Sequence, residues 1–81
     1  MDRQQVYQLV DGERTYQDSG EARPKSDAET SVGEWLIYIR WHLDSAFNHV
    51  YQLEETQALE SIRKIAALAV ACMEYNNTPT R

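Results

Sequence analysis

Apolar residues recur at steps of three and four along the middle of the chain. Such spacing puts the apolar side chains on one stripe of a helix. The stripe comprises Val32, Trp35, Leu36, Ile39, Leu43, Ala46, Phe47, Val50 and Leu53. Ser31 and Glu34 form a capping box at its start, in which each side chain accepts a hydrogen bond from the other residue's backbone amide. The pattern predicts a long helix over residues 32–53.

A second apolar pattern extends over residues 57–75 and predicts another helix. Thr56 is a candidate N-cap at its start, and Asn76 or Asn77 is a candidate left-handed cap at its end. A turn as short as residues 54–56 implies that the two helices are antiparallel neighbours.

The N-terminal part of the chain gives a weaker helical signal. Residues 2–17 have apolar positions at helical spacing, although Gly12 costs roughly 1 kcal/mol relative to alanine. Residues 18–30 are polar, contain Gly20 and Pro24, and have neither helical nor strand periodicity, which predicts a loop.

The segment from Ile65 to Met73 is apolar around the whole helix, so one neighbouring helix cannot cover it. We predict that this segment lies at the centre of a homo-oligomer, a dimer or a tetramer. The alternative is that residues 2–17 cover its second side within one chain. The predicted fold is therefore all-α: one domain of residues 1–81, with an antiparallel helical hairpin and a short N-terminal helix, in an oligomeric helical bundle.

Composition narrows the possible functions of these 81 residues. A net charge of −5 argues against general binding of duplex nucleic acid, because duplex affinity comes largely from Lys and Arg. No apolar run is long enough to span a membrane, and the first residues do not resemble a secretory signal. The expected location is the cytoplasm.

Cations and aromatic residues provide the candidate ligand-binding chemistry. A guanidinium beside aromatic rings suits a phosphate and a base, through hydrogen bonds and stacking. The candidate residues are Tyr38, Arg40, Trp41, Arg63 and Lys64. The alternative is that Arg40 and Arg63 form ion pairs with Asp44, Glu60 or Glu34 on solvated helix faces. Tyr38 and Trp41, which lie off the main stripe, indicate a second covered surface, either a subunit contact or a ligand pocket.

Metal and nucleophile chemistry are not expected. His42 and His49 are seven residues apart, which is not the spacing of a helical zinc pair, and Cys72 lies in the most apolar segment. No serine has a nucleophile-elbow context, and no single helix offers two paired carboxylates. The sequence predicts no metal, no cofactor and no catalytic residue.

The C-terminal third, from Ile62 through Met73 to Glu74 and ending Pro79-Thr80-Arg81, resembles small bacteriophage proteins of the MazG-like type. The segment around Glu13-Arg14 and the segment Gly33 to Ile39 are also similar to these proteins. The resemblance implies an all-α fold and the activity of a magnesium-dependent nucleoside triphosphate pyrophosphohydrolase. Enzymes of that family hold magnesium through a Glu-x-x-Glu and a Glu-x-x-Asp motif, and this chain has neither.

These observations favour binding over catalysis. The prediction is a phage protein that sequesters a small phosphorylated nucleotide at a subunit interface without turnover. The nucleotide could be an immune signal, by analogy with viral proteins that act as nucleotide sponges. One alternative is a MazG-like pyrophosphohydrolase that brings Glu34, Asp44 and Glu60 together between chains. Another is an inhibitor that binds a host protein.

Overall fold

The computed structural model describes residues 1–20 and 25–81, and every regular element in these ranges is helical. The elements are α1 (Arg3–Gly20), a short 3-10 helix η1 (Asp27–Glu29), α2 (Val32–Tyr51) and α3 (Glu55–Tyr75). The all-α prediction is therefore confirmed.

Three of the six helix ends differ from the predicted boundaries by two or three residues, and the other three agree to within one residue. The first helix continues to Gly20 instead of ending at residue 17, and α2 ends at Tyr51 instead of residue 53. The predicted loop at 18–30 is therefore shorter and contains η1, while its residues 21–24 lie outside the described residues. An ion pair between Arg14 and Asp18, four residues apart, favours the longer α1.

The capping box at the start of α2 is present as predicted. The amide of Glu34 donates to Ser31 Oγ at 3.1 Å, and the amide of Ser31 donates to Glu34 Oε1 at 3.1 Å. Lys25 Nζ lies 3.1 Å from Glu34 Oε2. The bond from the Ser31 backbone, followed by the Lys25 contact, lowers the pKa of the Glu34 carboxyl below its ordinary value.

The turn between α2 and α3 is a Schellman motif with a leucine where glycine is usual. Glu54 N donates to His49 O at 2.8 Å, and Leu53 N donates to Val50 O at 3.0 Å. Leu53 has φ of 60°, and its side chain is 90% exposed.

The predicted Thr56 N-cap and the predicted left-handed cap at Asn76 or Asn77 are both wrong, although Asn76 Nδ2 donates to Cys72 O at 2.8 Å. The N-cap is Glu54, without a side-chain cap bond, so α3 begins at Glu55 and Thr56 lies inside it. At the other end Asn76 is extended, and Leu53 is the one residue other than glycine with positive φ in the described ranges.

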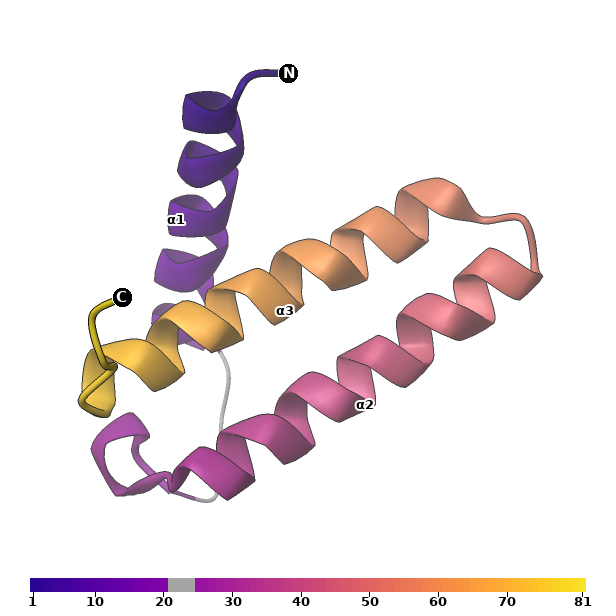
Figure 1. Cartoon of the computed structure of the whole chain (residues 1–81). Coiled ribbons are helices and arrows are strands. Elements are labelled where there is room, and N and C mark those ends of the chain that lie inside the picture. The colour runs from indigo at the N-terminus through magenta and orange to yellow at the C-terminus, as the bar shows by residue number, and fades with distance from the viewer. Residues whose placement is uncertain (21–24) are drawn as a thin grey trace.

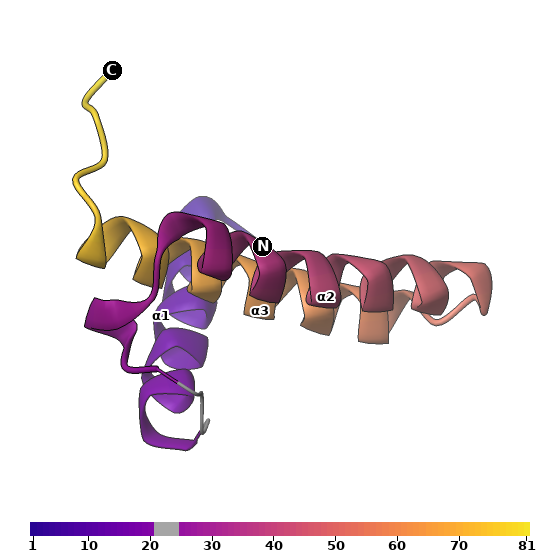
Figure 2. The same cartoon turned by 90° about the horizontal axis from the view of Figure 1, so that it is seen from below.

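The second and third helices lie side by side in opposite directions (Figure 1), and α1 crosses α3. Figure 2 shows α1 on one side of the α2–α3 pair, while residues 76–81 leave α3 toward the other side. The core is small and centres on Trp35, Leu68 and Ala71, with Tyr38, Ile39 and Cys72 packed against it. Cys72 thus behaves as a small apolar residue.

The first helix covers one side of the alanine-rich segment of α3, which is the arrangement considered as the alternative to an oligomer. Ala67 and Ala71 are buried, but Ala66, Ala69 and Val70 are only partly buried, and Met73 is half-exposed. The coverage within one chain is therefore partial.

Candidate functional site

Buried polar side chains hold α1 against α3. The Arg14 side chain is 7% exposed, and its guanidinium contacts Asp18, Glu74 at 3.1 Å and Asp27 at 3.4 Å. Burial lowers the pKa of this guanidinium, but the hydrogen bonds from Asp18 and Glu74 raise it above its ordinary value overall. Arg14 therefore stays charged and ties α1 to both α3 and η1.

A second contact of α1 involves Gln17, which is 1% exposed. Its Nε2 donates to the backbone carbonyl of Lys64 at 3.3 Å, and its Oε1 is buried with no hydrogen-bond partner in the described structure. Sequence reasoning missed both Arg14 and Gln17. The available signal was helical spacing. Arg14 follows Val10 by four residues and Gln17 follows Arg14 by three, so the three residues share one face of a helix that was otherwise read as polar.

Arg63, one of the predicted phosphate ligands, is in an ion pair. Its Nε donates to Glu13 Oε1 at 2.8 Å, and the Glu13 side chain is 7% exposed. Arg63 is thus ion-paired, as the alternative interpretation held, but the partners named there were wrong. The partner is the buried Glu13 of α1, not Asp44, Glu60 or Glu34.

Lys64 and Arg40 keep their charges unpaired in the described parts of the chain. No hydrogen bond or ion pair within residues 1–20 and 25–81 involves the ammonium of Lys64 or the guanidinium of Arg40. Lys64 is partly buried and Arg40 is exposed. Of the three predicted phosphate ligands, these two therefore have a charge that is free to meet an anion, whereas Arg63 does not.

The two predicted aromatic residues have different environments. Tyr38 belongs to the core, with its ring edge-on to Trp35 at a centroid distance of 6.3 Å. Trp41 is 69% exposed, and its ring meets His42 edge-on at 4.9 Å. Trp41 can therefore offer an open ring face for stacking, whereas Tyr38 serves the packing of α2 on α3.

Helical geometry sorts the candidate residues by side. The buried Trp35 marks the direction in which α2 faces α3. At about 100° per residue, Arg40 lies about 140° around α2 from Trp35, and Trp41 lies about 240° from it. Trp41 therefore turns toward the side that carries α1, and Arg40 turns toward the opposite side. Because Trp35 packs against Leu68 and Ala71 in an antiparallel pair, Lys64 is level with residues 40 and 41.

Lys64 lies on the side of α3 nearer to α1, where Gln17 reaches its carbonyl. The structure thus brings Trp41 and Lys64 to one side of the helix pair at one level, with Tyr38 beneath them in the core. It places Arg40 elsewhere and engages Arg63 with Glu13.

The acidic residues considered for magnesium are separated. Glu34 pairs with Lys25 and Glu74 pairs with Arg14, while His49 Nδ1 lies 3.4 Å from Glu54 Oε1. The described residues contain no group of three or more His, Cys, Asp or Glu side chains that could hold a metal ion.

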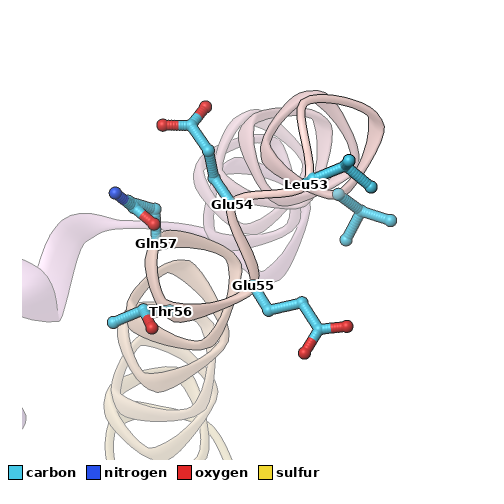
Figure 3. A pocket seen from close by; sticks show the side chains of 6 residues that line it. Leu53, Glu54, Glu55, Thr56 and Gln57 are labelled. Carbon is cyan, nitrogen blue, oxygen red and sulfur yellow. The ribbon is translucent and has the colours of Figure 1, made fainter.

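A shallow pocket lies at the tip of the α2–α3 pair (Figure 3). It is lined by Val50, Leu53, Glu54, Glu55, Thr56 and Gln57. Glu54 and Glu55 extend to opposite sides of the chain there. The lining therefore has a carboxylate on each side, together with the apolar side chains of Val50 and Leu53. This chemistry does not suit a phosphate, because the carboxylates repel an anion.

No protein-family model, curated protein or solved structure matches the chain. In the described residues, no helix is long and apolar enough to cross a membrane. The site is therefore interpreted from its own chemistry.

Proposed function

We propose that this chain is a binding protein that sequesters a small phosphorylated nucleotide at a subunit interface of a homo-oligomer, without turnover. The supporting observation is the exposed ring of Trp41 on the same side and level as the unpaired ammonium of Lys64. An aromatic ring stacks on any base, with about 1–3 kcal/mol per base, and an ammonium binds phosphate as a compact charge.

One chain supplies only part of the predicted ligand set. Arg40 lies about 100° from Trp41 around α2, on the other side of the helix pair. An Arg40 that contacts a nucleotide held by Trp41 and Lys64 would therefore have to come from a second copy of the chain. The similarity to MazG-like phage proteins points to the same ligand class and to the cytoplasm of an infected bacterium as the setting.

The exposed surface of the chain supports the homo-oligomer. The surface area is 6292 Å² for a chain of 9.4 kDa. Monomeric proteins of this mass expose about 5,000 Å² by size scaling, so the chain has roughly 1,300 Å² in excess. Residues 77–81 are exposed, and several large apolar side chains on α2 and α3 are about half-exposed or more.

Recovery of bound nucleotide tests sequestration against catalysis. The protein is incubated with a panel of cyclic and linear nucleotides and Mg²⁺, then heated, and the released nucleotides are identified by mass spectrometry. Sequestration returns the intact ligand. A MazG-like pyrophosphohydrolase returns a monophosphate and pyrophosphate, and a protein that acts only on a host protein depletes no nucleotide.

Charge variants of the folded protein then locate the site. Lys64→Gln should weaken the affinity for the recovered nucleotide about tenfold to hundredfold, because a charge-assisted contact contributes ~1.5–3 kcal/mol. Arg3→Gln, at an exposed cation near the chain start, is the matched control. Calorimetry that finds unchanged affinity in Lys64→Gln excludes this residue from the site.

Arg40→Gln tests the part played by a second copy. A tenfold loss of affinity in this variant supports a site completed between chains, whereas unchanged affinity indicates that one chain binds the nucleotide alone. Arg63→Gln is a poorer probe than the sequence suggested, because it leaves the buried Glu13 carboxylate without its partner.

A further inference from the structure

The side of the α2–α3 pair opposite α1 carries an uncovered apolar stripe on α2. Measured from the buried Trp35, its residues lie about 60–120° around the helix. They are Val32, Leu36, Leu43, Phe47 and Val50, and each is more than two-fifths exposed. The positions recur at helical spacing along the whole of α2, so the exposure is continuous and not a scatter of single residues.

A matching stripe follows α3 at alternating steps of three and four. Its residues are Leu59, Ile62, Ala66, Ala69 and Met73. They lie about 100–180° around α3 from Leu68. Arg63 and Glu74, which bind α1, lie in the other direction around the helix from Leu68. Alternating steps of three and four are the spacing with which helices pack as knobs into holes.

The two stripes form a single surface, here called the bare face. Because α2 and α3 are antiparallel, the same rotational sense on each helix leads to the same side of the pair. That side is the one α1 does not occupy (Figure 2). Two charged residues adjoin the stripes: Arg40, three residues before Leu43 on α2, and Glu55, four residues before Leu59 on α3. Between Leu59 and Met73 the α3 stripe carries no charge.

Leu53 gives a second observation at the end of the bare face. Its left-handed backbone and 90% exposure are both unfavourable for a branched apolar side chain. Within residues 1–20 and 25–81 nothing covers this side chain, yet it adjoins Val50, the last residue of the α2 stripe, in the tip pocket. Leu53 thus extends the apolar surface beyond the end of the helix.

We infer that the bare face packs against the bare face of a second copy, so that two α2–α3 pairs form a four-helix bundle. The inference rests on the homo-oligomer in the proposed function and assigns its interface. Permanent homodimers bury about 2,000–5,000 Å² in total, and an excess of roughly 1,300 Å² per chain, or about 2,600 Å² for two chains, falls within that range.

The composition of the bare face favours a second copy over a different partner. A two-fold dimer needs a patch that complements itself, and a face that is apolar over most of its length meets its own copy with little like-charge repulsion. Ala66 and Ala69 have small side chains at the middle of the α3 stripe, which permits close approach of another helix. Trp41 and Lys64 lie on the opposite side of the helix pair, so the proposed nucleotide site between chains needs a second contact of the assembly, as in a tetramer.

The oligomeric state of three glutamate variants tests the assignment. Phe47 and Ile62 lie on the bare face and are 56% and 51% exposed, and Ile37 lies away from it on α2 and is 66% exposed. Each glutamate should be tolerated by the single chain at these exposures, and circular dichroism checks that each variant stays helical. Light scattering at micromolar concentration then reports the mass.

We expect wild type and Ile37→Glu to have the mass of a dimer or a multiple of it, and Phe47→Glu and Ile62→Glu to shift to 9.4 kDa. A monomeric wild type, or dissociation by Ile37→Glu with Phe47→Glu still assembled, overturns the inference. Nucleotide recovery is scored separately. An assembly that returns no nucleotide contradicts only the proposed function. A monomer that returns one contradicts the bare face and the subunit-interface position of the site, but not nucleotide binding.

Discussion

The two sides of the α2–α3 pair are built on different chemistry. On one side α1 is held by buried polar groups: the Arg14 guanidinium among three carboxylates, the Glu13–Arg63 ion pair and the Gln17 amide. The other side is the bare face, which is apolar along both helices. Only the first side is complete within one chain.

The difference shows how each side is specified. Hydrogen bonds and ion pairs have strict geometry, so the polar side admits one position of α1 on α3. Apolar contacts are non-directional and scale with the area buried, so the bare face supplies free energy for association with little preference for an exact partner geometry. Polar contacts thus hold α1 in the chain's own fold, and the apolar area is the surface that we propose for assembly.

The largest expected effect comes from the core that both sides share. Trp35→Ala should lower the free energy of unfolding by about 3–5 kcal/mol, because it empties the centre of the Trp35, Leu68 and Ala71 cluster. Urea denaturation followed by circular dichroism measures it. Trp41→Ala is the control, since its exposed ring should cost well under 1 kcal/mol. Equal losses in the two variants would contradict the assigned core.

Removing the Arg14 guanidinium should weaken the packing of α1 on α3 and leave the α2–α3 pair intact. Arg14→Ala leaves several carboxylates close together without their cation, and we expect a loss of about 2–3 kcal/mol because Asp18 and Glu74 are half-exposed. Hydrogen exchange should show α1 opening while the middle of α2 stays protected. Arg3→Ala, on the same helix but exposed, is expected to change stability by about 0.5 kcal/mol or less.

The Schellman turn offers a test with opposite signs on the single chain and on the assembly. In the Phe47→Glu background, Leu53→Gly should stabilise the chain by about 0.5–1 kcal/mol, because glycine adopts the left-handed conformation without strain. In the wild-type background it should weaken association, since it removes an apolar side chain from the bare face. Thermal melts measure the stability of the single chain, and light scattering on dilution measures association. Stabilisation in both backgrounds would show that Leu53 does not contribute to the interface.

The smallest expected effect is the pH dependence of the α2 cap. The pKa of Glu34 is lower in the folded chain than its ordinary value of 4.5, so its contribution to stability is present above that value. It is lost as the pH falls through the lower folded value. Thermal melts from about pH 7 to about pH 3 should therefore show a steeper acid-side decline in wild type than in Glu34→Gln. Identical slopes would indicate that the capping box contributes nothing measurable.

Local features of this chain were open to sequence reasoning because their causes lie within a few residues. The stripe from Val32 predicted α2, and Ser31 with Glu34 predicted its first turn. The alternating apolar pattern likewise predicted α3 to within two residues at its start. Helix periodicity and capping depend on neighbours three and four residues away, which a sequence shows directly.

The arrangement of the helices was decided only in the tertiary structure. The contacts that place α1 join residues 47 to 60 positions apart: Gln17 to Lys64, Glu13 to Arg63 and Arg14 to Glu74. No local pattern encodes such a pairing, so the partner of Arg63 and the separation of Arg40 from Trp41 could not be read from the sequence. The sequence determined which residues are apolar and where the helices form, and the packing of α1 on one side of α3 decided which of those apolar residues remain exposed.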